Sequence, residues 1–145
     1  MNHIKHIGIY VRDIALEKAF YINCFDLIPI VNDLEDSGEL YDELTKRKNT
    51  KVNITKLITE YGSNTRIGEM IELIQIKTLS GELDNKRHIT DYGLSHVSFQ
   101  VNDIELVLQL VSENKGRICT KIYDIGKRRC CFIEDPEGNA IELIE

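Results

Sequence analysis

The sequence predicts an α+β fold built from two copies of one βαβββ module. Three observations support this prediction. The segment 6–11, His-Ile-Gly-Ile-Tyr-Val, is similar to segment 96–101, which follows it by 90 residues. The apolar stretch 71–74, Ile-Glu-Leu-Ile, recurs as 141–144. In both copies a strand-like alternation comes first and a helical periodicity comes second. Such self-similarity indicates a duplicated module whose two halves pack together to bury their apolar faces.

The first copy is expected to span residues 3–77. Its first strand covers 6–11, where aliphatic side chains alternate onto one face. Apolar residues then recur at helical spacing from Ile14 to Cys24 and predict a helix. Further strands are expected at 27–33, 52–60 and 69–77. The polar stretch 34–50 is expected to be a loop or a short irregular helix. Its residues 35–50 are expected to form a lid over the functional site or a contact with a second subunit.

The second copy is expected to span residues 93–145, after a polar linker at 78–92. Its strand at 96–101 precedes a helix that begins at Ile104, with Asn102 or Asp103 as the N-cap. This helix is expected to end at Lys115-Gly116. The remaining strands are expected at 117–123, 129–134 and 139–145, with a turn at 135–139. The two copies together are expected to form a single domain over residues 1–145.

Composition narrows the classes of function. The chain has 18 Lys+Arg and 24 Asp+Glu residues, a net charge of −6, and no long basic block, so non-specific binding to nucleic acid is not expected. No stretch approaches the roughly 18 consecutive apolar residues of a membrane helix. The first residues lack the apolar segment of a secretory signal. We therefore expect a cytoplasmic protein with a small-molecule partner and four reduced, structural cysteines.

Four side chains mark a candidate site. His6 and His96 lie on the strand faces opposite the aliphatic rows, and Glu72 and Glu142 interrupt otherwise apolar strands. An ionised carboxylate in such a strand costs several kcal/mol unless it is paired or bound to metal. A single residue of this kind is usually structural, but here both anomalies occur twice at equivalent positions. Two His and two Glu side chains suit a divalent ion such as Zn, Ni, Co, Mn or Fe(II).

A larger set of motifs runs along the chain, namely His6-Ile7-Gly8-Ile9, Val11, Asp13, Phe20-Tyr21, Phe25-Asp26-Leu27, Ile71-Glu72-Leu73, Gly93-Leu94-Ser95-His96-Val97 and Asp135 to Leu143. These motifs resemble the vicinal oxygen chelate superfamily, which includes glyoxalase I, methylmalonyl-CoA epimerase, extradiol dioxygenases, and fosfomycin-resistance and bleomycin-binding proteins. The resemblance covers nearly the whole chain and implies a paired, incompletely closed β-barrel. The family usually has Leu-Gly-Leu where this chain has Phe25-Asp26-Leu27, but Asp tolerates a left-handed backbone.

The resemblance also implies a metal site and a type of reaction. The family's ligands lie on the first and last strands of each module, and His6, Glu72, His96 and Glu142 match those positions. Glyoxalase I and the epimerase fill all four positions, whereas extradiol dioxygenases and fosfomycin-resistance enzymes do not use the position of Glu72. Glu72 therefore favours a lyase or isomerase that transfers a proton next to a metal-bound carbonyl or enediolate, with Glu142 and Glu72 as base and acid in an open order. The alternatives are a three-ligand dioxygenase or resistance enzyme, and a non-catalytic drug-binding protein.

Substrate contacts are less sharply defined by the sequence. Tyr10, Ser98 and Gln100 share strand faces with the proposed ligands and are candidate substrate-binding residues, although they suit the polar filling of a barrel equally well. The basic runs Lys46-Arg47-Lys48 and Lys127-Arg128-Arg129 are expected to be mostly solvated. Either run would be able to receive the carboxylates of glutathione or the phosphates of coenzyme A. The resemblance also makes a homodimer the expected assembly.

Overall fold

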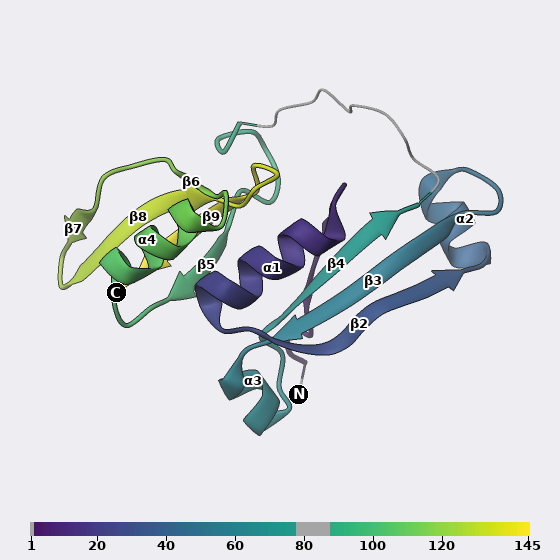
Figure 1. The fold of residues 1–145 in the computed structure, drawn as a ribbon, viewed down its shortest axis with the longest axis horizontal. Coiled ribbons are helices and arrows are strands. Elements are labelled where there is room, and N and C mark those ends of the chain that lie inside the picture. The colour runs from purple at the N-terminus through teal and green to yellow at the C-terminus, as the bar shows by residue number, and fades with distance from the viewer. Residues whose placement is uncertain (1, 78–87) are drawn as a thin grey trace. The chain divides into compact units, whose positions relative to one another are not determined.

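The computed structural model describes residues 2–77 and 88–145 and contains two sheets (Figure 1). The chain divides into two compact units. The first comprises Met1–Ile22 and Asp26–Glu82, and the second comprises Asn23–Phe25 and Leu83–Glu145. The α+β class is confirmed, and both units begin with a strand, then a helix, then further strands. The first unit has the strand order of a βαβββ module, and the second departs from it by one additional short strand. Most of the expected linker, residues 78–87, lies outside the described residues, and the single domain over 1–145 stays a prediction.

The first unit is built on a four-stranded sheet with the order β1-β4-β3-β2. β1 runs parallel to β4, and the other two pairings are antiparallel. The parallel pair is central to the site because it brings the first and last strands of the module side by side. The elements of this unit are β1 (Ile7–Tyr10), α1 (Ile14–Phe25), β2 (Ile28–Ser37), α2 (Glu39–Thr45), β3 (Lys51–Ile58), α3 (Glu60–Thr65) and β4 (Met70–Ile76). The last three residues of α1, Asn23–Phe25, belong to the second unit.

Helix α1 begins and ends where its sequence requires. The Asp13 side chain accepts a hydrogen bond from the Leu16 backbone N–H at 3.0 Å, which satisfies one of the free donors of the first turn. The helix stops at Asp26, whose φ of 53° is left-handed, so the departure from the family's glycine is accommodated as expected. Phe20 and Tyr21 are fully buried and anchor the helix in the core.

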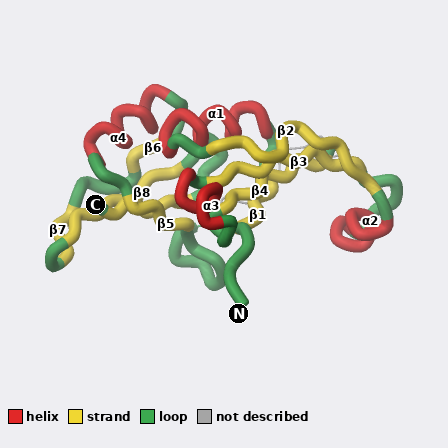
Figure 2. The backbone as a smooth tube through the Cα atoms, turned by 90° about the horizontal axis from the view of Figure 1, so that it is seen from below, coloured by secondary structure: helices red, strands yellow, loops and turns green. Residues whose placement is uncertain are grey.

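The stretch 34–50 differs in part from its sequence-based interpretation. β2 continues as far as Ser37, so the loop expected from residue 34 is wrong for its first four residues. α2 then occupies Glu39–Thr45, which confirms the alternative of a short helix. The sequence did not indicate this part of β2, because its side chains are mostly polar. They are polar because β2 is an edge strand whose residues are almost all exposed. Figure 2 shows α1 on one side of the strands and α2 at their end on the other side.

The second unit is built on a sheet with the order β5-β9-β8-β6, to which β7 is added by pairing with β8. β5 and β9 are parallel, as β1 and β4 are in the first unit. The strand expected at 117–123 is in fact two short strands, β6 and β7. The elements are β5 (Val97–Gln100), α4 (Ile104–Glu113), β6 (Arg117–Ile118), β7 (Tyr123–Ile125), β8 (Arg128–Glu134) and β9 (Ala140–Ile144).

The helix cap of the second unit repeats that of the first. Asp103 caps α4 by accepting a hydrogen bond from the Leu106 backbone N–H at 2.9 Å, as Asp13 does for α1. The ring of Phe25 stacks on that of Phe99 with centroids 4.1 Å apart.

Among the described residues, no helix has the length and apolar character needed to cross a membrane.

The last strand of each unit buries alternate residues. On β4, Ile71 and Leu73 are at most 4% exposed, and on β9, Ile141 and Leu143 are fully buried. The glutamate between each pair therefore faces the other side of its sheet. This alternation gives each unit one closely packed face and one face that carries the candidate site residues.

Candidate metal centre

The first unit brings His6 and Glu72 together. Gly8 is opposite Glu72 across the parallel β1–β4 pair, so His6, two residues earlier, is the diagonal neighbour on the same face. His6 Nε2 lies 3.1 Å from Glu72 Oε2, and the Glu72 side chain is 14% exposed. A Cβ at Gly8 would lie 4.0 Å from Glu72 Oε2, an ordinary van der Waals distance, so this position directly neighbours the carboxylate.

The second unit repeats this pair with His96 and Glu142. Ser98 is opposite Glu142 across the parallel β5–β9 pair, and His96 is again the diagonal neighbour. His96 Nε2 lies 3.5 Å from Glu142 Oε2, and the Glu142 side chain is 22% exposed. A hydrogen bond of 2.6 Å joins His96 Nδ1 to Ser95 Oγ. This bond orients the imidazole and leaves Nε2 directed at the carboxylate, as in many histidine metal ligands.

Sequence reasoning missed Lys56, which contacts Glu72. Lys56 on β3 is opposite Glu72 on β4, and its Nζ lies 3.0 Å from Glu72 Oε1. The two oxygens of Glu72 are therefore divided between an imidazole and an ammonium group. Lys56 could have been found from the sequence in the same way as Glu72. It is a charged residue that lies in β3 between Ile54 and Ile58, which are both buried.

The donor atoms of each pair fit a divalent ion. Two ligands about 2.1 Å from one ion and at roughly a right angle to each other lie about 3 Å apart. The His–Glu separations of 3.1 Å and 3.5 Å are close to this value. Within residues 2–77 and 88–145, no group of three or more His, Cys, Asp or Glu side chains is gathered in a way that holds a metal. Each unit thus supplies two donors, and the four-ligand site stays a prediction.

The candidate substrate-binding residues lie on the strands that carry the ligands. Tyr10 is opposite Ile74, Ser98 is opposite Glu142, and all three candidates, including Gln100, are exposed. The structure adds Tyr41 of α2, whose hydroxyl donates a hydrogen bond of 2.8 Å to Asp36. Burial, this hydrogen bond and nearby negative charge raise the pKa of Tyr41 to about 12, so the hydroxyl keeps its proton at neutral pH.

One of the two basic runs is partly occupied by structural contacts. Arg129 forms ion pairs with Glu105 on α4 and with Glu145 after β9. These contacts raise the pKa of Arg129 and connect the helix to the end of the chain. In this run only Lys127 and Arg128 are therefore available to receive an anionic group.

Comparisons with known proteins identify the family. Residues 3–143 match the family model of the Glyoxalase/Bleomycin resistance protein/Dioxygenase superfamily. The match covers nearly the whole chain, so the protein belongs to this superfamily, as its motifs indicated. A search of curated proteins found no match.

Solved structures support the same fold. A glyoxalase family protein from Bacillus cereus is 20% identical, with a TM-score of 0.83 over 100% of this chain and 94% of that one. A glyoxalase/dioxygenase from Nostoc punctiforme is 21% identical, with a TM-score of 0.66 over 99% of this chain and 90% of that one. The fosfomycin resistance protein FosX from Listeria monocytogenes, complexed with Mn(II) and sulfate, is 14% identical, with a TM-score of 0.55 over 99% and 92%. At these identities the likeness concerns the fold alone.

Proposed function

We propose that this protein is a divalent-metal-dependent lyase or isomerase that moves a proton on the carbon next to a carbonyl group, like glyoxalase I or methylmalonyl-CoA epimerase. One observation carries the proposal: a His–Glu pair with the spacing of metal ligands occurs in both units, at 3.1 Å and at 3.5 Å. Membership of the superfamily supports it, as does the Mn(II) in the complex of the FosX relative. The proposed partners are a small-molecule substrate and a second copy of this chain.

Each residue of the two pairs has a role in this proposal. His6, Glu72, His96 and Glu142 would hold the ion, which when bound would polarise the carbonyl oxygen of the substrate. A glutamate then takes the proton from the neighbouring carbon and returns it to the same or an adjacent carbon. Glu142 is the stronger candidate for the first step, because Lys56 already engages one oxygen of Glu72. The residue opposite Glu142 on β8 is Phe132, which carries no charge, so no cation faces Glu142 at this position.

Exchange of substrate hydrogen for deuterium tests the proposed reaction directly. The metal-loaded chain would be incubated in D₂O with hemithioacetals and with acyl-CoA epimers, and the products analysed by NMR. We expect deuterium on the carbon next to the carbonyl, since the base exchanges its proton with solvent between the two transfers. A metal-loaded protein that converts neither class and exchanges no proton would contradict the proposal.

The Lys56–Glu72 ion pair favours a second candidate, an enzyme that uses His6, His96 and Glu142 as its three ligands. An ammonium group 3.0 Å from Glu72 Oε1 would neutralise that carboxylate and take it out of the ligand set. The Glu72→Ala variant separates the two candidates. A lyase or isomerase with four ligands should lose both its metal and its activity, whereas a dioxygenase or resistance enzyme with three should keep both. A wild-type protein that binds a small molecule tightly but no metal would instead be a binding protein.

A further inference from the structure

We propose that Lys56 is an anion-binding side chain of this site, and that the ligand held on this face of the first unit is therefore an anion. The inference rests on the proposed function, because it concerns the ligand that joins the bound metal. It adds a residue and a substrate class that the four proposed ligands do not define.

The position of Lys56 next to Glu72 follows from the pairing of the strands. β3 and β4 are antiparallel, and Lys56 and Glu72 are directly opposite each other on one face of the sheet. The Lys56 side chain is 33% exposed, so its ammonium group is partly shielded but still reachable from solvent. Such a group has three N–H donors, and its ion pair with Glu72 leaves donors for a second acceptor.

The repeat shows that Lys56 is not a general feature of the module. In the second unit the residue opposite Glu142 on β8 is Phe132. Its ring lies edge-on to the imidazole of His96, with centroids 5.2 Å apart. The equivalent position is therefore filled by an aromatic ring in one unit and by a cation in the other. A merely structural need of the module would be met by an apolar residue, as it is at Phe132.

The charges of Glu72 and Lys56 determine which kind of ligand the bound ion would prefer. Glu72 alone would offset one of the two charges of a divalent ion. Lys56 balances the charge of Glu72, so the His6–Glu72–Lys56 cluster is neutral while the imidazole is neutral. More of the charge of the ion is then left for its remaining ligands. A negatively charged ligand is the one that neutralises this excess positive charge. It would be a carboxylate on the substrate, or the enolate oxygen that forms when a proton leaves.

The neighbouring groups are consistent with a small organic anion. Gly8 is opposite Glu72 and has no side chain, so β1 places no side chain against the carboxylate at this position. Tyr10, two residues further along β1, is 53% exposed and offers a hydroxyl on the same face. Tyr41 keeps its proton at neutral pH and adds no negative charge. The substrate class we infer is a small carboxylic acid with a carbonyl or hydroxyl group next to the reacting carbon.

The proposal is tested by measuring how tightly azide and imidazole bind to the full-length protein loaded with Co(II). The comparison separates an effect of the charge of the ligand from an effect of its shape. Both are small metal ligands, but azide binds a metal as an anion, whereas imidazole binds as the neutral base that predominates above pH 8. Their affinities can be read from the visible spectrum of Co(II), without any enzymatic assay. We expect Lys56→Met to weaken azide about tenfold and to change imidazole less than twofold, since one partly screened charge is removed. Lys56→Arg should keep the azide affinity.

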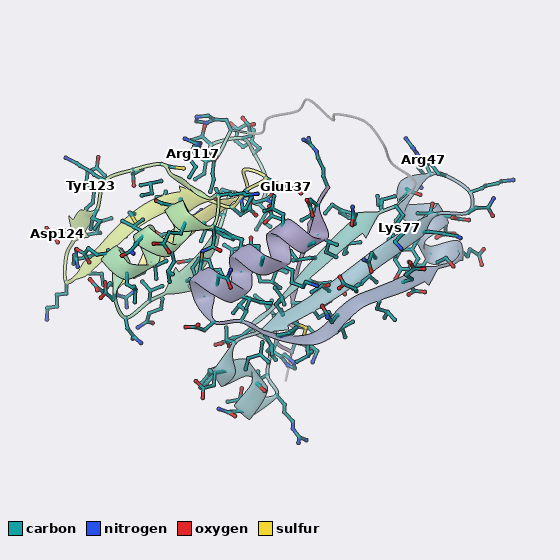
Figure 3. The ribbon with its side chains drawn as sticks, viewed as in Figure 1. Arg47, Lys77, Arg117, Tyr123, Asp124 and Glu137 are labelled. Carbon is teal, nitrogen blue, oxygen red and sulfur yellow. The ribbon has the colours of Figure 1, made fainter. Side chains whose placement is uncertain are left out.

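Lys77 provides a matched control directly after the neighbouring strand, β4. It forms an ion pair with Glu35 and is 38% exposed, close to the 33% of Lys56, but it lies at the α2 end of the sheet (Figure 3). Lys77→Met should leave both affinities unchanged. Equal azide affinity in wild type and Lys56→Met, or equal losses for azide and imidazole, would overturn the inference while leaving the proposed function in place. A wild-type protein that binds no Co(II) would overturn both.

Discussion

Replacement of Glu142 by glutamine is expected to lower turnover by about 10²–10⁴-fold, the usual contribution of a general base. Glutamine has nearly the same shape and can still offer an oxygen toward His96 Nε2, which is 3.5 Å from the present carboxylate. It has no negative charge with which to accept a proton. The loss should therefore appear in kcat in the deuterium-exchange assay, with the circular dichroism spectrum unchanged.

Glu134→Gln is the matched control for this variant. Glu134 lies on β8 of the same sheet, its side chain is 27% exposed against 22% for Glu142, and it pairs with Arg117 at the surface. Exposed ion pairs contribute at most about 1 kcal/mol, so this variant should fold and turn over normally. Near wild-type turnover in Glu142→Gln would remove Glu142 from the mechanism. Equal losses in both variants would indicate a general effect of lost charge.

Leu73→Ala is expected to lower the free energy of unfolding by about 2–5 kcal/mol. Leu73 is fully buried on β4, between Ile9 on β1 and Thr55 on β3. Removing its side chain leaves a cavity on the packed face of the sheet, immediately behind Glu72. Small domains unfold with about 5–15 kcal/mol in total, so the loss is a large share of their stability. Urea denaturation should show a lower midpoint with an unchanged slope.

The control for this prediction is Leu40→Ala on α2. Leu40 is 62% exposed, so its truncation removes little buried surface and should change the free energy of unfolding by less than about 0.5 kcal/mol. A loss below about 1 kcal/mol for Leu73→Ala would mean that the β4 side chains are not packed as described, and would put the positions of Glu72 and His6 in doubt.

The parts of the fold that depend on local sequence could be predicted. The two strand–helix openings follow from alternation and then helical spacing. Asp103, which caps α4, is one of the two N-caps expected for that helix, whereas Asp13, which caps α1, was not among the expected caps. The residues of the His–Glu pairs could be singled out because the repeat placed the same two anomalies at equivalent positions, and the four-ligand site that was expected from them stays a prediction. The left-handed residue that ends α1 followed from the tolerance of Asp26 for positive φ.

The parts that depend on pairing between distant segments could not be predicted. Lys56 faces Glu72 because of the β3–β4 register, and nothing in either strand's own periodicity fixes that register. The extension of β2 to Ser37 depends on pairing with β3 rather than on apolar side chains. The separation of β6 from β7 likewise reflects where each strand pairs with β8.

Metal stoichiometry of the purified chain tests the central claim most directly, namely that the two His–Glu pairs together bind one divalent ion. Elemental analysis would be run on wild type and on His6→Ala and His96→Ala, after loading with Mn, Co, Ni or Zn and removal of excess ion. We expect about one ion per chain in wild type and a loss of at least tenfold in affinity in each variant, since each removes one ligand. No stoichiometric metal in wild type, or full retention in both variants, would contradict it.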